Sequence, residues 1–313
     1  MTIIVVIGTL HMDFTVAVDR IPRLGETVLG WGFKMFPGGK GANQAVAASL
    51  LGAETYIVSR VGDDYIGKLL LKNALSKGVN VDYVLKDPSS HSGVALIIVD
   101  SKGNNIIAVA SGVDKNISRK DIDRAENILR QADIVLIQLE IPLETAIYAV
   151  EKASQYKCKI ILNPAPAKPL PQNIYRKIDI LTPNIREAET LSNIEIRDNS
   201  DLEKVGKYFL DLGLKELVVT LGSRGAYIYT ENIRKIVPTI DVKVVDTTGA
   251  GDAFNAGLAV AISEGREIDE AVFFANCVAS LKVTKMGAQE GLPTRKEVEE
   301  FIKNLDRRYF EWI

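Results

Sequence analysis

The strongest constraint on the fold is the alternation, from Ser118 onward, of short β-branched runs with longer helical patterns. Strands that are separated by helices pair in parallel within one sheet, because each helix returns the chain to the edge where the next strand begins. A parallel sheet buries both of its faces, so helices are needed on both sides. The sequence therefore predicts a three-layer α/β fold with a mostly parallel central sheet. Its strands are expected at residues 1–7, 134–139, 159–162, 180–181, 217–221 and 242–245.

Helical patterns separate these runs, and two of them carry capping signals. Asp201 is expected to cap a helix at residues 202–212, because a short acidic side chain can accept the first unpaired N–H groups of a helix. The last helix should begin near Thr294, which is followed three residues later by Glu297, as in a capping box. The remaining helices are expected at residues 42–51, 66–77, 119–130, 143–154 and 253–264.

Two stretches have no helix between their strand-like runs, namely residues 14–18 with 28–36, and 94–99 with 106–110. Each pair is expected to form an antiparallel hairpin, and a turn-rich linker joins the second pair. Two hairpins distant in sequence can form one small sheet that projects from the central one. Such a sheet could be a lid over the strand ends or a dimer interface. The alternative is an extension of the central sheet without a function of its own.

Length and charge bound the class of protein. A chain of 313 residues corresponds to about two domains or to one large α/β unit. Lys and Arg number 38 and Asp and Glu number 40, which gives a formal net charge of −2, and the charges are interspersed. No basic surface for nucleic acid is therefore expected. No apolar run approaches the roughly 18 residues that span a bilayer, so no membrane partner is expected either.

Cysteine and histidine are scarce. Cys158 and Cys277 stand in unrelated contexts, which excludes a disulfide framework and a cysteine-based zinc site and favours the reducing cytoplasm. His11 and His91 are the only histidines, so a Ser-His-Asp mechanism and a His-rich metal centre lack their residues. The chemistry is expected to rest on carboxylates, glycines and cations.

Residues 246–254 form a glycine-rich string between a predicted strand and a predicted helix. Glycines let the backbone fold tightly, so that N–H groups of the first helical turn can point at an anion from the positive end of the helix dipole. A phosphate would bind there. Asp252 in this turn is expected to stay ionised at neutral pH and to accept the proton of a hydroxyl that attacks the phosphoryl group. The alternative is that Asp252 only caps the helix.

A second glycine-rich string, residues 37–45, also lies between a strand and a helix. It is not a Walker A loop, because Lys34 and Gly41 stand where that motif requires Gly and Ser or Thr. The first strand also lacks a G-x-G-x-x-G fingerprint, which argues against an NAD-dependent oxidoreductase. Backbone amides exposed by glycines, with Lys40 and Asn43 as further donors, suit a polyhydroxylated small molecule. The alternative is a simple turn into the helix.

Two weaker signals are residues 220–225 and residues 182–187. Taken alone, the first could be an ordinary hairpin turn, and Asn184 and Glu187 could form only a helix cap. Both strings lie at the carboxyl ends of consecutive strands, however, which is where open α/β sheets bind ligands.

Together these strings resemble the PfkB, or ribokinase-like, family of carbohydrate and nucleoside kinases, and the resemblance covers nearly the whole chain. Residues 36–48 match the N-terminal signature of the family and residues 246–257 match its C-terminal signature, and both signatures are highly specific. The resemblance implies one kinase domain over residues 1–313, with a lid at about residues 13–37 and 92–111 through which two copies form a homodimer. Further matching strings are residues 61–64, 138–140, 162–167, 182–184 and 287–289.

By this resemblance, the reaction is transfer of the γ-phosphoryl group of ATP to the 5-hydroxyl of D-ribose, which gives ribose 5-phosphate and ADP. Another sugar or a nucleoside as the acceptor, and a non-catalytic sugar-binding protein, remain as alternatives. Asp252 would be the base, and the amides of Gly249, Ala250 and Gly251 would form the anion hole. The residues that would meet the sugar hydroxyls are Asp13, Gly39, Lys40, Asn43, Glu140 and Asp252.

The resemblance also implies sites for ATP and two metal ions. Glu187 matches an element that orders Mg²⁺ through water. A monovalent cation, usually K⁺, would bind beside the anion hole, mostly through backbone carbonyls. ATP would lie against Asn184, Thr220, Gly222, Ser223, Gly225, Gly251 and Asn276. The positions for the monovalent cation are Asp246, Thr248, Lys282, Lys285, Gly287 and Gly291.

Two positions depart from the family pattern. The first sugar-binding element of the family typically reads Asn-x-Asp, and here His11 stands in place of the Asn. His11 could make one hydrogen bond to the sugar, or it could be a partly exposed loop residue without a ligand role. Gly291 stands where the family commonly places Ser, which would remove one side-chain ligand of the monovalent cation.

Overall fold

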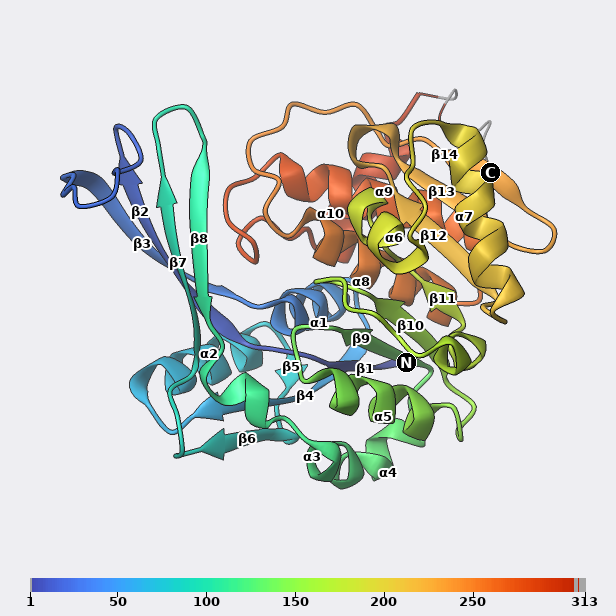
Figure 1. Ribbon diagram of the computed structural model, residues 1–313, viewed down its shortest axis with the longest axis horizontal. Coiled ribbons are helices and arrows are strands. Elements are labelled where there is room, and N and C mark those ends of the chain that lie inside the picture. Colours follow the sequence, from blue (N-terminus) through green and yellow to red (C-terminus); the bar gives the residue numbers. More distant parts are fainter. Residues whose placement is uncertain (1, 307–308, 310–313) are drawn as a thin grey trace.

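The alternating strands and helices build a central sheet between two helical layers (Figure 1). This computed structural model describes residues 2–306 and 309. Within that part of the chain, the central sheet has ten strands in the order β14-β13-β12-β11-β10-β9-β1-β4-β5, with β6 also paired to β4. The strands are β1 (Ile3–Ile7), β4 (Glu54–Gly62), β5 (Val79–Asn80), β6 (Val84–Asp87), β9 (Ile134–Gln138), β10 (Lys159–Asn163), β11 (Ile180–Leu181), β12 (Glu216–Thr220), β13 (Ala226–Tyr229) and β14 (Arg234–Val237).

The pairing is parallel from β5 through β12, and only β13 and β14 are antiparallel. Side chains alternate between the faces, so that Ile4 and Val6 point to one side of β1 while Val5 and Ile7 point to the other. The first face is covered by α1 (Lys40–Leu50), α2 (Tyr65–Ser76), α8 (Ala250–Ser263), α9 (Ile268–Val283) and α10 (Arg295–Lys303). The second is covered by α3 (Arg119–Arg124), α4 (Glu126–Leu129), α5 (Leu143–Ala153), α6 (Ile185–Ser192) and α7 (Asn199–Asp211). The predicted fold class is confirmed.

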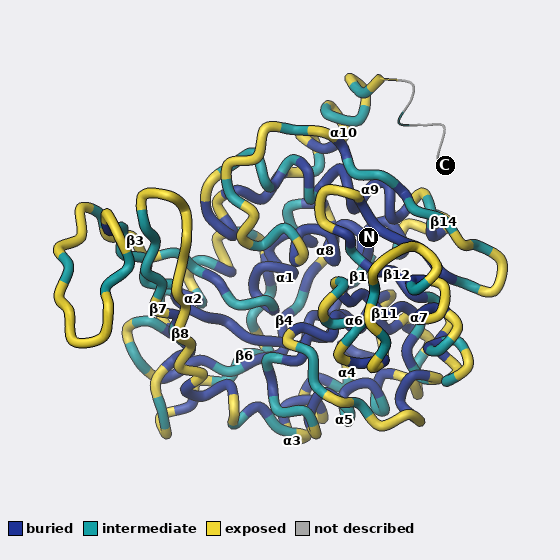
Figure 2. The backbone as a smooth tube through the Cα atoms, turned by 45° about the horizontal axis from the view of Figure 1, so that its top comes forward, coloured by how far each residue is buried: buried dark blue, intermediate teal, exposed yellow. Residues whose placement is uncertain are grey.

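The small sheet combines the two predicted hairpins in the order β3-β2-β7-β8. Its strands are β2 (His11–Val18), β3 (Gly30–Gly38), β7 (Gly93–Val99) and β8 (Asn105–Ala110). Each hairpin is antiparallel, and β2 joins β7 in parallel. The sheet stands apart from the layers in Figure 1, and Figure 2 shows that its outer loops are exposed. The hairpins are confirmed, whereas the role of the sheet as a lid stays a prediction.

The predicted strand at residues 242–245 is wrong. The chain between β14 and α8 is irregular, and Val244 and Val245 are 58% and 50% exposed. The backbone N–H groups of Val245 and Asp246 instead donate to the carbonyl oxygen of Val283, at 2.7 and 3.1 Å. β-Branched residues favour a strand only where a partner strand can accept their hydrogen bonds, and this segment meets the end of a helix instead.

Two helix predictions also need correction, and one helix was not predicted. The cap of α7 is Asp198, which accepts from the N–H groups of Ser200 and Asp201, so the helix begins earlier than expected. The single helix expected at residues 119–130 is broken at Ala125 into α3 and α4. Helix α9 was missed because it is buried around most of its circumference and shows little amphipathic contrast. The cap at Thr294 is confirmed, with Glu297 completing the capping box.

No helix in the described part of the chain combines the length and the apolar character that crossing a membrane requires.

Candidate active site

Glycines bring helix α1 against the end of strand β1. The first turn of α1 lies so close that a Cβ atom on Gly41 would come within 2.5 Å of the Thr9 nitrogen. Gly39, directly before the helix, has a φ angle of 86°, in the region that favours glycine. The N–H of Ala42 donates to the Thr9 carbonyl at 2.9 Å. The loop after β1 and the start of α1 therefore form one unit at the carboxyl edge of the sheet, where α/β folds bind ligands.

Asp252 lies in the first turn of α8 and is only 5% exposed. Its Oδ2 accepts a hydrogen bond from Asn43 Nδ2 at 2.8 Å, and its Oδ1 accepts one from Gln44 Nε2 at 3.0 Å. Burial raises the pKa of Asp252, and this outweighs the opposing effects of the Lys40 charge and the two amide hydrogen bonds. A carboxylate with a raised pKa is a stronger proton acceptor than an exposed aspartate.

The Asn43 side chain is fixed in its orientation by a chain of amides. Its Oδ1 accepts a hydrogen bond from Gln289 Nε2 at 3.0 Å, and the Oε1 of Gln289 accepts one from Asn73 Nδ2 at 2.7 Å. Because its oxygen is engaged by a donor, the Asn43 amide presents its nitrogen to Asp252. Gln289 belongs to a string that matched the family, but no feature of the sequence assigned it this role.

A second chain of amides fixes Gln44. Its Oε1 accepts from Gln138 Nε2 at 2.6 Å, so its Nε2 must serve as the donor, to Asp252 and, at 3.3 Å, to Asn163 Oδ1. These side chains come from α1, from the end of β9 and from the end of β10. Sequence analysis missed Gln44 and Gln138 as functional candidates. The available signal was the placement of fully buried amides in otherwise apolar elements.

Lys40 lies near the predicted base, Asp252, and also near Glu140 and Glu187, which were predicted to bind the sugar and magnesium. The negative charge of Asp252 contributes most to raising the pKa of Lys40, Glu140 and Glu187 add to this effect, and burial opposes it. The backbone N–H of Lys40 also donates to Glu140 Oε2 at 3.0 Å, and the Thr9 hydroxyl donates to the same oxygen. One cation therefore lies among three carboxylates that the sequence assigned to three functions.

His11 is buried, which contradicts the alternative of a partly exposed loop residue. It is 5% exposed, begins strand β2, and places Nε2 2.6 Å from Asp114 Oδ2. Burial lowers the pKa of His11, but the hydrogen bond and charge of Asp114 raise it overall. Asp114, which no sequence motif singled out, has a buried Oδ1 with no hydrogen-bond partner in the described structure. The His11 ring is thus held by a carboxylate.

Asp13 lies two residues further along β2, against the end of β3. A Cβ atom on Gly38 would come within 2.6 Å of Asp13 Oδ2, so glycine is required where the two strands meet. Burial raises the pKa of Asp13 to about 6, with the nearby charges of Glu140 and Asp252 adding to this effect and His11 opposing it. Asp13 is therefore ionised at neutral pH but titrates close to it.

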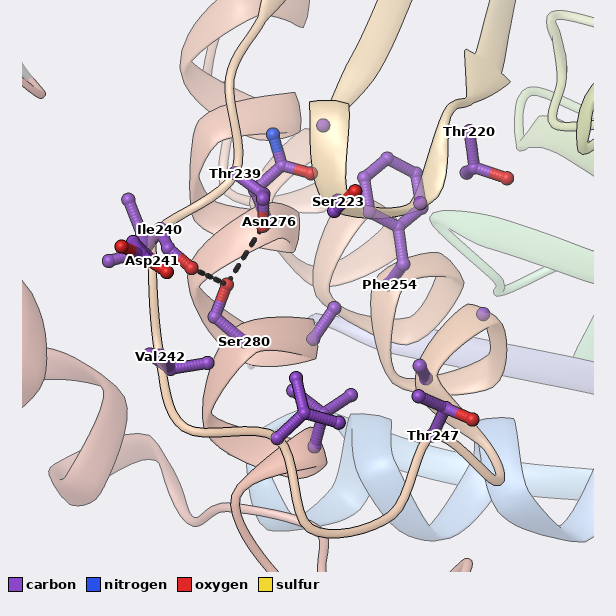
Figure 3. A pocket seen from close by; sticks show the side chains of 17 residues that line it. Thr220, Ser223, Thr239, Ile240, Asp241, Val242, Thr247, Phe254, Asn276 and Ser280 are labelled. Carbon is purple, nitrogen blue, oxygen red and sulfur yellow. Dashed lines mark hydrogen bonds between the residues drawn. The ribbon is translucent and has the colours of Figure 1, made fainter. Parts of the chain in front are cut away.

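A cavity of about 460 Å³ opens beside the start of α8 (Figure 3). Six of the seven residues predicted to contact ATP line it, namely Thr220, Gly222, Ser223, Gly225, Gly251 and Asn276. The amide of Asn276 donates to the carbonyl oxygens of Val237 and Pro238, at 3.0 and 3.2 Å, so it secures the wall after β14. This wall, residues 239–242, and Phe254 on α8 were missed by the sequence analysis, because residues 242–245 were interpreted as a strand.

Asn184, the seventh predicted ATP contact, does not line this cavity. It caps α6, with Asn184 Oδ1 accepting from the Glu187 N–H and Glu187 Oε2 accepting from the Asn184 N–H, both at 2.9 Å. Burial raises the pKa of Glu187, although the hydrogen bond from Asn184 and the charge of Lys40 act against it. The alternative for this pair, a helix cap, is therefore present. Glu187 also lies near Lys40 and Asp252, and with Glu140 these residues form the charged cluster of the site.

The predicted anion hole begins at Gly249, the N-cap of α8, with a φ angle of 77°. A Cβ atom on Gly249 would lie 3.3 Å from the carbonyl oxygen of Ala288. A Cβ atom on Gly251 would meet nothing within 4 Å, so a ligand can approach its backbone. The N–H of Ala250 instead donates to the Thr247 carbonyl at 3.1 Å. Both Ala250 and Gly251 line the cavity, but only the Ala250 N–H already has a backbone acceptor in this turn.

The residues predicted to hold a monovalent cation gather around Asp246. Its Oδ1 accepts from the Thr248 N–H at 2.9 Å and its Oδ2 from the Gly287 N–H at 2.8 Å. Burial raises the pKa of Asp246, but these hydrogen bonds and the charge of Lys282 lower it overall. The Lys285 side chain points elsewhere and pairs with Glu297 at 2.6 Å. Asp246 therefore ties the loop before α8 to the loop after α9.

Comparison with known proteins gives a consistent result. The sequence profile of the pfkB family carbohydrate kinases matches residues 1–295. A ribokinase from Bacillus subtilis is 42% identical over 299 residues, which cover 96% of this chain and 99% of that protein. A deoxyribokinase from Salmonella typhi is 35% identical over 300 residues, which cover 96% of this chain and 98% of that protein.

Among solved structures, the ribokinase of Arabidopsis thaliana complexed with ribose and ATP has a TM-score of 0.90 and 33% identity, and the match covers 97% of this chain and 100% of that one. The profile match over nearly the whole sequence, together with curated relatives well above 30% identity, settles the family. This chain belongs to the PfkB family of carbohydrate kinases.

Proposed function

We propose that this protein is an ATP-dependent kinase that phosphorylates the 5-hydroxyl of D-ribose and releases ribose 5-phosphate and ADP. The observation that carries the proposal is the Asp252 carboxylate, held as an acceptor by Asn43 and Gln44 at the N-terminus of α8. It lies between the cavity suited to ATP and the carboxylates suited to a sugar. Similarity to ribokinases from several organisms supports ribose as the acceptor.

In the proposed reaction, the sugar hydroxyl gives its proton to Asp252 as its oxygen forms a bond to the γ-phosphorus and the bond to the β-phosphate oxygen breaks. The phosphoryl group carries charge that the helix dipole of α8 and the N–H of Gly251 can stabilise. The Lys40 ammonium adds a positive charge near Asp252. Because both oxygens of Asp252 are held by amides, the base is oriented before the substrate arrives.

The sugar would be bound by groups that recognise hydroxyls. Asp13 and Glu140 can accept hydrogen bonds from them, and Lys40 and Asn43 can donate. His11 stands in place of the Asn of the family pattern, and its ring is hydrogen-bonded to Asp114. The molecule that accepts the phosphoryl group could therefore differ from ribose. The second candidate is therefore a kinase of a related sugar or a nucleoside, and the similarity to a deoxyribokinase makes 2-deoxyribose the first competitor to test.

The charged cluster also fits a magnesium ion held through water. Glu187 is half-buried, faces Lys40 and Asp252, and uses Oε2 for the cap of α6. Mg²⁺ keeps several of its waters and binds mainly through substrate phosphates, so one nearby carboxylate is sufficient. When bound with ATP, the ion would neutralise charge on the phosphates.

The small sheet would act as the lid of a single domain, with residues 13–37 and 92–111 closing over the sugar. Two lids would also cover each other in a homodimer, because β8 is exposed along its length and carries Ile106, Ile107 and Val109, each more than half exposed. Apolar side chains gathered on one exposed strand are typical of an interface. The two free cysteines, both buried, are compatible with the reducing cytoplasm, where we place the reaction.

The proposal is tested by measuring ADP release with ATP and a panel of acceptors: D-ribose, 2-deoxy-D-ribose, D-fructose, adenosine and cytidine. The highest kcat/KM is expected for ribose, with product phosphorylated at the 5-position by ³¹P NMR. The Asp252→Asn variant is the matched control, because it keeps the side-chain shape and should bind ribose while its kcat falls by about 10²–10⁴. A higher kcat/KM for a nucleoside, or ribose binding without any phosphorylation by the wild type, would overturn the assignment.

A further inference from the structure

Lys282 is a buried lysine without a role in the proposed reaction. It lies in the last turn of α9, and its side chain is completely shielded from solvent. Its Nζ donates to the backbone carbonyl oxygen of Asp246 at 2.9 Å and lies 3.9 Å from Asp246 Oδ2. Burying an ammonium group is costly unless it meets oxygen ligands, so its position here calls for a physical reason.

Asp246, whose carbonyl oxygen receives this ammonium, is one of the residues that the family resemblance assigned to a monovalent cation held mostly by backbone carbonyls. A free K⁺ and a lysine ammonium carry the same single charge, and both seek backbone carbonyl and carboxylate oxygens. They cannot share one oxygen at close range without strong repulsion. The residues present therefore do not fit a K⁺ ion at this position.

Gly291 lies close both to the carbonyl oxygens of the loop after α9 and to the Lys282 side chain. A Cβ atom placed on Gly291 would lie 3.2 Å from the Cε of Lys282, and 2.9 and 3.1 Å from the carbonyl oxygens of Gly287 and Lys285. The family commonly places Ser at this position, and a serine side chain would enter the space that the lysine methylene groups approach. The lysine at 282 and the glycine at 291 therefore belong to one arrangement.

We propose that the Lys282 ammonium is a tethered cation that takes the place of the exchangeable monovalent cation, so that this kinase does not require K⁺. The inference rests on the proposed kinase function, but whether Lys282 excludes a cation depends only on the loop that carries Asp246, before α8. Lys282 is a positioning residue: it contacts Asp246, three residues before the glycine that begins α8, and has no contact with a substrate.

The lysine would act through the loop that carries the anion hole. The Asp246 carboxylate accepts hydrogen bonds from the N–H of Thr248 in this loop and from the N–H of Gly287 in the loop after α9. A cation on the Asp246 carbonyl fixes the direction of the peptide that leads to Gly249. It also adds positive charge behind the α8 N-terminus, where the phosphoryl group would gain negative charge. Both effects are those expected of a bound K⁺, without the entropy loss of capturing a free ion.

The first experiment compares the wild type in KCl, NaCl and tetramethylammonium chloride at equal ionic strength. We expect ADP release and the unfolding temperature to differ little, less than about twofold and less than about 2 °C. Binding of Tl⁺, a K⁺ analogue, is followed by ²⁰⁵Tl NMR, which requires no turnover, and no site is expected. A more than tenfold activation by K⁺, or a Tl⁺ site in this loop, would overturn the proposal.

The second experiment restores the exchangeable site with Lys282→Ala and with Lys282→Ala/Gly291→Ser. Both variants should lose at least tenfold in kcat in tetramethylammonium chloride, and K⁺ should rescue the double variant and raise its unfolding temperature. Lys282→Met is the matched control, because it fills the same space without charge and should not be rescued. If Lys282→Ala keeps its activity and stability without K⁺, the lysine is not a substitute cation and the proposal is wrong.

These readouts separate the two proposals. If the protein phosphorylates no sugar, the proposed function fails, but the unfolding temperature and ²⁰⁵Tl NMR still report whether Lys282 excludes a monovalent cation. If the kinase is active but K⁺-dependent, only the inference about Lys282 fails.

Discussion

The Asp252→Asn variant tests the central physical claim, because it removes the proton acceptor while keeping the size and shape of the side chain. A positioned general base contributes about 10²–10⁴ to a rate, so kcat should fall by this factor, which corresponds to about 3–5 kcal/mol of activation free energy. The contacts of Asp252 place the expected loss towards the upper end. They also predict a second effect, on stability, that a surface carboxylate would not show.

That second effect follows from the fixed donors. Asn43 and Gln44 both present N–H groups to Asp252, and Gln289 and Gln138 prevent their amides from turning over. The amide nitrogen of the new side chain would therefore face a donor, leaving two buried N–H groups without an acceptor. Such an unsatisfied group costs roughly 1–3 kcal/mol, so we expect a lower unfolding temperature as well as a lower kcat.

The assay measures kcat by coupled ADP release, ribose affinity by titration calorimetry, and the unfolding temperature by scanning calorimetry. Asp13→Asn is the control, because it removes a carboxylate from the sugar side and should raise the KM for ribose more than it lowers kcat. The reasoning is refuted if Asp252→Asn keeps kcat within about threefold of the wild type. A normal unfolding temperature would instead refute the fixed-donor argument alone.

Further predictions follow from the same contacts. Burial raises the pKa of Asp13 to about 6, so its ionised form is lost as the pH falls through 6. Initial-rate measurements should therefore show the KM for ribose rising several-fold between pH 7.5 and 5. A KM that does not change with pH would exclude Asp13 as a ligand of the sugar. Gly39→Ala places a Cβ atom 2.8 Å from two backbone atoms, at a residue whose φ angle is 86°. Scanning calorimetry should therefore show that the free energy of unfolding falls by about 1–3 kcal/mol. Gln289→Leu frees the Asn43 amide to turn, and kcat should fall at nearly constant ribose affinity. Ile107→Lys on β8 should shift sedimentation from dimer to monomer, and an unchanged profile would place the interface elsewhere.

The sequence was sufficient where the determining interactions are local. Glycine strings predict where a helix begins at a ligand site, because the positive φ angle that glycine allows is a local property, 86° at Gly39 and 77° at Gly249. The hairpins of the small sheet follow from alternation and turn residues. The alternation of strands and helices similarly predicts the parallel sheet, since the strands from β9 to β12 each pair with the next strand along the chain, whereas the pairing of β1 with β9 is distant in sequence.

The sequence was insufficient where a residue acts through a distant partner. Gln289 reaches Asn43 across 246 positions, and His11 meets Asp114 across 103. No periodicity reports such a pair. Residues 242–245 were mistaken for a strand for a related reason. Their β-branched side chains are typical of a strand, and only the packing shows that the Val283 carbonyl accepts the N–H groups of Val245 and Asp246.

The choice of amides rather than cations around Asp252 follows from what a base requires. An arginine paired with Asp252 would lower its pKa by one to three units and weaken it as a proton acceptor. Asn43 and Gln44 orient the carboxylate with less stabilisation of its charge, and burial keeps its pKa raised. Positive charge is still needed for the transferred group, and Lys40 and Lys282 supply it. The charge of Lys40 lowers the pKa of Asp252 more than either amide hydrogen bond does, so burial has to outweigh this cation as well as the amides for Asp252 to remain an effective base.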